Sequence, residues 1–285
     1  MTETVKIAAA QIDIRFADRK ANLARMEQVL RETAQQGAGL TIFPECALAG
    51  YCFESLDEAR PLAETIPGPG TERLTVICKE LNVHAVFGLL EADGPRLYNA
   101  CVLVGPDGVV GRYRKVHLPY LGIDRFTTPG DRFDVFDCGE MKLGMNICYD
   151  GAFPEAARVM ALDGADLIVL PTNWPPGAEC TADFVTNARA LENNVYYAAV
   201  NRVGTERGFR FIGQSKICDP SGCVLAQAAH EDEAILYADI QPALAREKHL
   251  VRVPGKHEID RFADRRPAAY GRIIEPIAAD ARPKT

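Results

Sequence analysis

Apolar and polar residues follow one another along the chain in two periodicities, which predict alternating strands and helices. Short apolar runs at 5–12, 40–43, 84–89, 141–147, 166–170, 195–200 and 234–240 are typical of buried strands. Helical patterns occupy 22–33, 71–81, 154–162 and 180–193. The segments 101–110 and 217–225 each contain a Pro- and Gly-bearing turn and are expected to be hairpins. This order indicates a mixed sheet, or two sheets, with helices outside.

The two halves of the chain carry similar sets of elements, and no low-complexity linker separates them. We therefore expect residues 1–285 to form one domain. The segment from about 250 to 285 is rich in charge and shows no clear periodicity. Such a tail is expected either to fray or to pack on a partner subunit.

Composition narrows the classes of function. A net charge of −7 without a Lys/Arg run argues against nucleic acid as a partner. The first residues lack the layout of a signal peptide, and no apolar stretch is long enough to span a membrane. Nine cysteines at scattered spacings do not make a disulfide framework. A cytoplasmic location with free thiols is therefore expected.

Three reactive side chains each belong to a segment that ends a predicted strand. Glu45 follows 42–44, Lys115 lies in 111–119, and Cys148 follows 143–147. The carboxyl ends of strands in α/β folds meet at one edge, where active sites form. A carboxylate, an ammonium and a thiol there are suited to acyl transfer. Cys148 also opens a strand-to-helix turn, where the helix end favours a thiolate.

Other residues offer competing interpretations. Cys46 could be the nucleophile, but neighbours in an extended segment point to opposite sides, so we expect it in the core. His117 follows the lysine closely and suggests a Cys–His dyad as an alternative. The other histidines show no paired metal spacing, and no phosphate-binding or dinucleotide fingerprint is present. We therefore expect no metal and no cofactor.

The blocks Phe-Pro-Glu at 43–45, Arg-Lys-Val-His-Leu at 114–118 and Asn-Ile-Cys-Tyr-Asp at 146–150 occur in one order. Together with 189–202, they resemble the nitrilase superfamily of carbon–nitrogen hydrolases, over nearly the whole chain. The resemblance implies an α/β fold, a four-layer α-β-β-α sandwich of nitrilase type. It also implies a homodimer, or higher homo-oligomer, that stacks two sandwiches as αββα-αββα through helices beside the active site, with help from the tail.

The resemblance also implies roles for the site residues. Glu45 would be the general base, Cys148 would form a thioester, and Lys115 with the backbone N–H of Tyr149 would hold the oxyanion. Many family members have a second glutamate after the lysine, and the nearest carboxylate here is Asp124. Either Asp124 takes that place or the fourth member is missing.

The pair after the nucleophile bears on the substrate. Nitrilases of the family usually show Cys-Trp-Glu, whereas Cys-Tyr-Asp at 148–150 is similar to the amidase and carbamoyl-amidase branches. The resemblance thus implies hydrolysis of a small linear amide or N-carbamoyl amide with release of ammonia. Tyr51, Asn173 and Trp174 would line the pocket. The alternatives are a nitrilase acting on R–CN and a non-catalytic binding or scaffold protein on this fold.

Overall fold

The computed structural model describes residues 4–228 and 231–276. Contacts within the chain separate two compact units, Met1–Glu247 and Lys248–Thr285. No helix in the described ranges is long and apolar enough to cross a membrane. The assignment of all 285 residues to one domain and the cytoplasmic location stay predictions.

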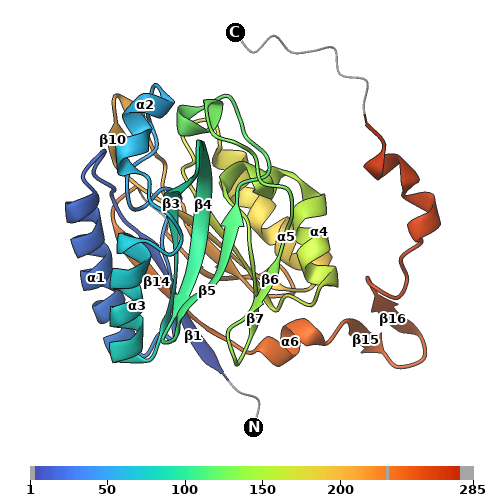
Figure 1. Ribbon diagram of the computed structural model, residues 1–285. Coiled ribbons are helices and arrows are strands. Elements are labelled where there is room, and N and C mark those ends of the chain that lie inside the picture. The colour runs from blue at the N-terminus through green and yellow to red at the C-terminus, as the bar shows by residue number, and fades with distance from the viewer. Residues whose placement is uncertain (1–3, 229–230, 277–285) are drawn as a thin grey trace. The chain divides into compact units, whose positions relative to one another are not determined.

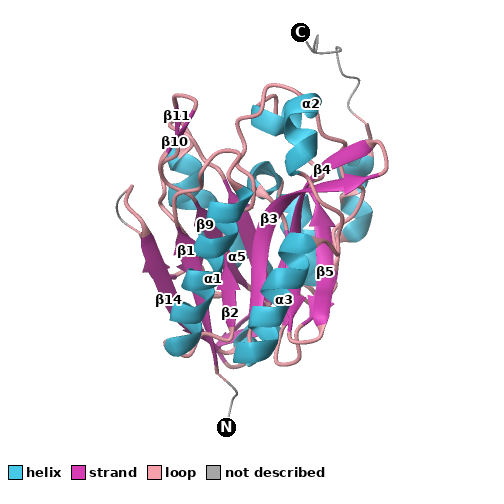
Figure 2. Cartoon of the chain, turned by 60° about the vertical axis from the view of Figure 1, so that its left-hand side comes forward, coloured by secondary structure: helices cyan, strands magenta, loops and turns pink. Residues whose placement is uncertain are grey.

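The first unit contains a sheet of six strands, in which β1, β2 and β3 run parallel and β14, β4 and β5 complete the sheet by antiparallel pairing. Its strands, in spatial order, are β14 (Ala234–Ile240), β1 (Val5–Gln11), β2 (Leu40–Ile42), β3 (His84–Asp93), β4 (Arg96–Gly105) and β5 (Gly108–Arg114). Helices α1 (Arg19–Gln35) and α3 (Pro69–Leu81) lie across its outer face (Figure 2).

A second sheet of six strands repeats the plan, with β7, β8 and β9 parallel at its centre. Its strands, in spatial order, are β13 (Val224–Gln227), β12 (Lys216–Cys218), β9 (Tyr196–Asn201), β8 (Leu167–Thr172), β7 (Lys142–Met145) and β6 (Val135–Asp137). Helices α4 (Pro154–Leu162) and α5 (Thr186–Asn193) cover it on the side opposite α1 and α3 (Figure 1).

Apolar packing joins these layers. Met26 and Leu30 of α1 and Leu74 of α3 are fully buried against the first sheet. Between the sheets, the Cys101 sulfur of β4 lies 3.7 Å from the Met145 sulfur of β7. The unit is therefore a four-layer α-β-β-α sandwich, as the resemblance to the nitrilase superfamily implied.

Short elements complete the first unit. They are α2 (Leu56–Ala59), η1 (Arg60–Leu62), η2 (Gly122–Arg125), η3 (Cys148–Ala152), the π-helical turn η4 (Thr181–Val185), β10 (Thr205–Glu206), β11 (Phe209–Arg210) and α6 (Pro242–Arg246).

The helix expected at 180–193 is divided, because η4 precedes α5. The buried Lys216 ammonium binds the carbonyl oxygens of Ala182 and Asp183 in this turn, at 2.8 and 2.9 Å. A side chain bound to helix carbonyls competes with the regular backbone bonds, which accounts for the wider turn. The apolar pattern alone contains no such signal.

The second unit begins with a hairpin that the sequence pattern did not predict. Strands β15 (His249–Val253) and β16 (His257–Asp260) pair antiparallel around a turn with Gly255 at φ +68°. The short 3₁₀ turns η5 (Pro267–Ala269) and η6 (Gly271–Ile274) follow. The register shifts between Val251 and Val253, which interrupts the simple alternation by which a strand is recognised. Packing of this tail on a partner stays a prediction.

Candidate active site

Three sheet strands end beside the residues that the sequence singled out. Glu45 lies in the turn after β2, Lys115 directly follows β5, and Cys148 opens η3 after β7. The Lys115 ammonium nitrogen lies 2.7 Å from Glu45 Oε1, and both side chains are completely buried. The structure thus brings the predicted base and cation into a direct ion pair at the sheet edge.

The backbone of Glu45 lies close against strand β3 because of Gly88. Gly88 donates to Pro44 O at 3.1 Å and accepts from Leu48 N–H at 3.2 Å. A Cβ at this position would lie 2.3 Å from the Cys46 nitrogen and 2.7 Å from the Glu45 Cα. Only glycine fits without moving the turn that carries the carboxylate.

Asp124, the sequence candidate for a fourth member, lies in η2 and contacts the same ammonium. Its Oδ2 is 2.5 Å from Lys115 Nζ and 2.8 Å from the Tyr51 hydroxyl. Asn99 of β4 donates to Asp124 Oδ1 at 2.8 Å and to Glu45 Oε1 at 2.7 Å. We call Glu45, Lys115 and Asp124 the charged cluster; one buried cation is shared by two buried carboxylates.

Cys148 has a φ of +46° and is only 7% exposed. Its left-handed backbone is uncommon for a residue with a Cβ and is typical of constrained functional turns. Asp150 holds the turn. It accepts from Ile147 N–H at 3.0 Å, from the Tyr113 hydroxyl at 2.7 Å and from His117 N–H at 2.9 Å. Asp150 therefore ties the cysteine turn to the segment that carries Lys115.

Burial dominates the electrostatics of the thiol. The pKa of Cys148 is raised to about 12, because burial and then the Glu45 charge raise it by more than Lys115 lowers it. The sequence-based expectation of a thiolate at the helix end is wrong for the resting site, because desolvation outweighs the field of one short helical turn. As a nucleophile, this thiol would need a base that takes its proton during attack.

The two charged neighbours of the thiol respond to burial in opposite ways. Burial raises the pKa of Glu45, and Lys115 opposes this rise. Burial alone would lower the pKa of Lys115, but the Asp124 and Glu45 carboxylates hold it well above its ordinary value. Lys115 is therefore a permanent cation at neutral pH.

Some polar atoms of the site are unpaired. Glu45 Oε2 is buried and has no hydrogen-bond partner within the described ranges, whereas Oε1 has two. The backbone N–H of Tyr149 belongs to the first turn of η3, where N–H groups have no partner within the helix. Tyr149 is 42% exposed, and its ring packs edge-on against Phe153.

The residues predicted to line the pocket occupy different positions. Tyr51 is buried, and its ring centre lies 5.8 Å from the Lys115 ammonium. Asn173, just after β8, is buried, and neither side-chain polar atom has a partner in the described part of the chain. Burial raises the pKa of Cys148, while a hydrogen bond from the Asn173 backbone lowers it. Trp174 is 3% exposed, and its backbone N–H donates to Asn201 Oδ1 at 2.9 Å.

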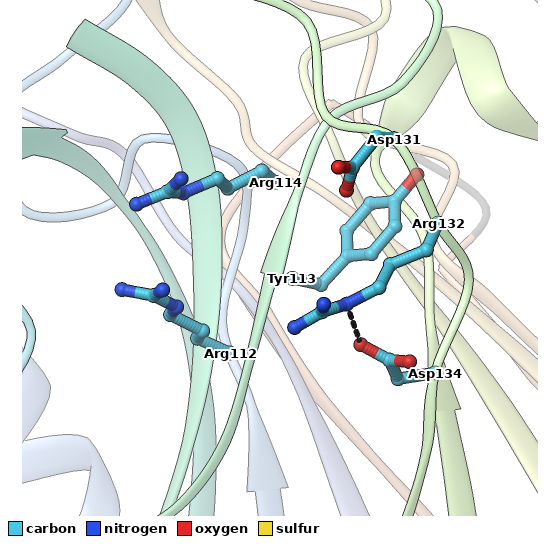
Figure 3. Close-up of a pocket in the computed structure, with 6 residues that line it drawn as sticks. All are labelled: Arg112, Tyr113, Arg114, Asp131, Arg132 and Asp134. Carbon is cyan, nitrogen blue, oxygen red and sulfur yellow. Dashed lines mark hydrogen bonds and ion pairs between the residues drawn. The ribbon is translucent and has the colours of Figure 1, made fainter. Parts of the chain in front are cut away.

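One hollow lies near Tyr51, and another lies beside strand β5. One of about 260 Å³ adjoins Tyr51, whose hydroxyl lies 3.1 Å from the carbonyl oxygen of Leu121 in its wall. This hollow is lined by Cys52, Glu54, Tyr120, Leu121, Gly122, Arg125, Glu206, Arg207 and Phe209. The other, of about 120 Å³, is lined by the residues in Figure 3, and its Arg132 pairs with Asp134 at 2.7 Å. Arg112 and Arg114 pair with Glu91, so the second hollow has no arginine free for an anion.

The sequence did not identify Asn99 or Gly88, and it treated Asp150 only as a marker of the branch. Asn99 is a polar residue inside an otherwise apolar strand, which is a usable signal. The partners of Asp150 come from β5 and the segment after it, far away in the sequence. Their convergence requires the sheet topology.

A family model described as carbon-nitrogen hydrolase matches residues 6–249. The chain is 40% identical over 274 residues to a protein of Pyrococcus abyssi named nitrilase, covering 94% of this chain and 100% of that one. It is 34% identical over 253 residues to the omega-amidase NIT2 of Mus musculus, covering 83% and 88%.

Solved structures agree with these relatives. A Glu-to-Gln variant of the amidase from Nesterenkonia sp. AN1, which carries the acetamide moiety of fluoroacetamide on its active-site cysteine, superposes with a TM-score of 0.76 at 25% identity over 93% of this chain and 95% of that one. Nit3 of Saccharomyces cerevisiae gives 0.77 at 25% identity over 86% and 92%. The chain therefore belongs to the carbon–nitrogen hydrolase family, in the nitrilase superfamily, and is a cysteine-dependent enzyme that hydrolyses carbon–nitrogen bonds.

Proposed function

We propose that the enzyme hydrolyses a small linear amide or N-carbamoyl amide and releases ammonia, with Cys148 as nucleophile, Glu45 as general base and Lys115 as oxyanion donor. The observation that carries this proposal is the charged cluster. A buried ammonium lies 2.7 and 2.5 Å from two carboxylates, and the Glu45 charge acts on the Cys148 thiol.

The first half-reaction uses the unpaired carboxylate oxygen of Glu45 as the proton acceptor. Glu45 Oε2 takes the Sγ proton as sulfur attacks the carbonyl carbon. The carbonyl oxygen becomes an oxyanion, which the Lys115 ammonium and the Tyr149 N–H stabilise. When the carbon–nitrogen bond breaks, Glu45 returns the proton to the leaving nitrogen. Ammonia departs and the acyl group remains as a thioester.

The second half-reaction uses the same groups. Glu45 takes a proton from water, and the hydroxide formed attacks the thioester carbon. The carbon–sulfur bond then breaks, and the proton restores the Cys148 thiol. For an amide, the sum is one water consumed, one carboxylic acid formed and one ammonia released.

Asp124 is proposed as the fourth member of the site. It accepts from Lys115 and lies 2.8 Å from both the Asn99 amide nitrogen and the Tyr51 hydroxyl. In this position it fixes the ammonium against Glu45 and keeps it protonated. Tyr51, Asn173 and Trp174 are proposed to line the substrate pocket, with the unpaired Asn173 amide available to the substrate.

The proposal of an amide rather than a nitrile as the substrate rests on Cys-Tyr-Asp at 148–150 and on the omega-amidase relatives. The relative from Pyrococcus abyssi named nitrilase favours a nitrile as the second candidate. Ammonia release should be measured with a nitrile, its matching amide and the matching carbamoyl compound. Dominant turnover of the nitrile would refute the amide proposal.

Two variants complete this experiment. Cys148→Ala should abolish release from every substrate, whereas Cys218→Ala, which removes a buried thiol from β12, should retain it. If no substrate is turned over and an amide-shaped electrophile labels Cys148 no faster than other thiols, the result favours the non-catalytic alternative.

A homodimer is the proposed assembly. Val159 and Leu162 of α4, Phe184 of η4 and Leu191 of α5 are large apolar residues with exposed side chains. Contiguous exposed apolar surface is typical of interfaces. Light scattering should give twice the chain mass, and Phe184→Glu should reduce that mass. A monomeric wild-type protein would contradict this assembly.

A further inference from the structure

Asn99 occupies the centre of the charged cluster, although it carries no charge. It lies in β4 and is 1% exposed. Its side-chain nitrogen donates to Glu45 Oε1 at 2.7 Å and to Asp124 Oδ1 at 2.8 Å. An amide nitrogen has two hydrogens, so each carboxylate receives one. No hydrogen of this side chain is left for substrate.

The backbone and side-chain oxygens of Asn99 also accept hydrogen bonds. Its backbone oxygen accepts from the Lys115 N–H at 2.8 Å. Its side-chain oxygen accepts from the Cys46 thiol at 3.5 Å. The reverse orientation of the amide would place its oxygen against two carboxylate oxygens, so the neighbours determine which way it points. One residue therefore contacts every member of the charged cluster.

Two carboxylates that share one cation repel each other, and each can move towards the ammonium or take up a proton. A neutral double donor between them lowers this repulsion and fixes their separation. We propose that Asn99 is a positioning residue that holds Glu45 and Asp124 on either side of Lys115 and keeps Glu45 ionised as the base. This inference rests on the proposed catalytic role of Glu45.

The electrostatics agree with the geometry. Burial raises the pKa of Glu45, Lys115 lowers it, and the hydrogen bond from Asn99 also lowers it. Removing the amide should therefore raise the pKa of Glu45 and protonate the base over a wider pH range. A residue that only filled space in β4 would not have this effect.

The test is the pH profile of kcat/KM for Asn99→Leu, which keeps the volume and removes both donors. We expect the midpoint of the acid limb to rise by about one pH unit or more, because hydrogen bonds to charged groups have about that strength. At neutral pH, kcat should fall while KM changes little, since Asn99 has no hydrogen for substrate.

Asn22→Leu is the matched control. Asn22 is buried in α1 and also donates two bonds, to the carbonyl oxygens of Arg15 and Leu48 at 2.8 and 3.2 Å. Asn22 also accepts from the Arg15 N–H, so its loss removes three side-chain hydrogen bonds, as does the loss of Asn99, but none is to a carboxylate, and the acid midpoint should stay unchanged. Asn99→Ser, a smaller change that also loses both carboxylate bonds, should show the same rise as Asn99→Leu and carries the test if the leucine variant does not fold.

The outcomes distinguish a failure of the positioning role of Asn99 from a failure of the proposed mechanism. If both Asn99 variants lose activity equally at every pH, with the wild-type midpoint, the residue is structural and the inference is wrong, while the proposed mechanism stands. If Cys148→Ala remains active, the proposed mechanism itself fails. A raised midpoint in the Asn99 variants, absent from Asn22→Leu, supports the positioning role.

Discussion

Replacing Lys115 by methionine tests whether one cation holds the site together. Its ammonium lies 2.7 Å from Glu45 and 2.5 Å from Asp124, with all three side chains fully buried. Coulomb's law at an effective dielectric constant of about 20 gives about 6–7 kcal/mol of attraction for each contact, before the cost of burying the ions is subtracted. Lys115→Met leaves two buried carboxylates without a counterion, so we expect unfolding free energy to fall by about 3–5 kcal/mol near neutral pH.

This loss should depend on pH, and its sign follows from Glu45. Burial raises the pKa of Glu45 above its ordinary value of 4.5, and Lys115 opposes the rise. Without Lys115 that pKa rises further. A group whose pKa is raised by folding contributes stability below its unfolded pKa, and this contribution is lost as pH increases through the folded value. The variant should therefore approach wild type in acid and become progressively less stable above the unfolded pKa of Glu45.

The assay is urea unfolding followed by circular dichroism at about pH 5 and about pH 8. Lys216→Met is the control, because Lys216 is also buried but donates to the carbonyl oxygens of Ala182 and Asp183 and to the Asn187 amide oxygen. Its loss should be similar at both pH values. Equal losses at both pH values for Lys115→Met would refute the reasoning, as would a total loss below about 1 kcal/mol.

Three further outcomes follow from the geometry. In the ammonia assay, Gly88→Ala should lower kcat by about 100-fold or more, because its Cβ would lie 2.7 Å from the Glu45 Cα. Gly39→Ala should be neutral in the same assay, because its Cβ would meet no atom nearer than 3.8 Å. Glu45→Gln should reduce turnover by about 10²–10⁴-fold, yet lower the pKa of Cys148 below about 12 in a titration of thiolate absorbance; an unchanged titration would contradict the coupling. Asp150→Asn should slow acylation of Cys148 in single-turnover experiments while KM changes little, and wild-type acylation would show that Asp150 does not hold the turn.

Much of the fold was predictable because its buried strands are continuous apolar runs. The helix Pro154–Leu162 ends where the pattern predicted, and strands such as Val5–Gln11 differ by one residue. The prediction was wrong where a side chain that is distant in the sequence determines the backbone conformation. Lys216 comes from β12, yet it binds the turn at Thr181–Val185 and divides the helix expected there. No local pattern contains that information.

The candidate site likewise contains residues that the local sequence indicates and residues that only the fold identifies. Glu45, Lys115 and Cys148 were predictable because each follows an apolar run and because their blocks resemble a family in its order. Asp124 was a candidate because the resemblance implies a second carboxylate after the lysine, and its contact with Lys115 emerges only when η2 is placed against β5. The bonds of Asn99 join three segments that are distant in the sequence. Residues that act chemically leave local signals, whereas the residues that position them depend on topology.

The protonated state of Cys148 has a mechanistic consequence. A thiol whose pKa is about 12 is ionised only about once in 10⁴ molecules near pH 8. The negative charge of Glu45 raises that pKa, and the same carboxylate is the proposed proton acceptor during attack. The thiol therefore stays unreactive until a carbonyl carbon is in place and Lys115 can stabilise the oxyanion that forms. We expect an amide-shaped electrophile, which can use the oxyanion donors, to modify Cys148 much faster than a simple alkylating agent of equal intrinsic reactivity. Equal rates would mean that the thiolate exists before substrate arrives.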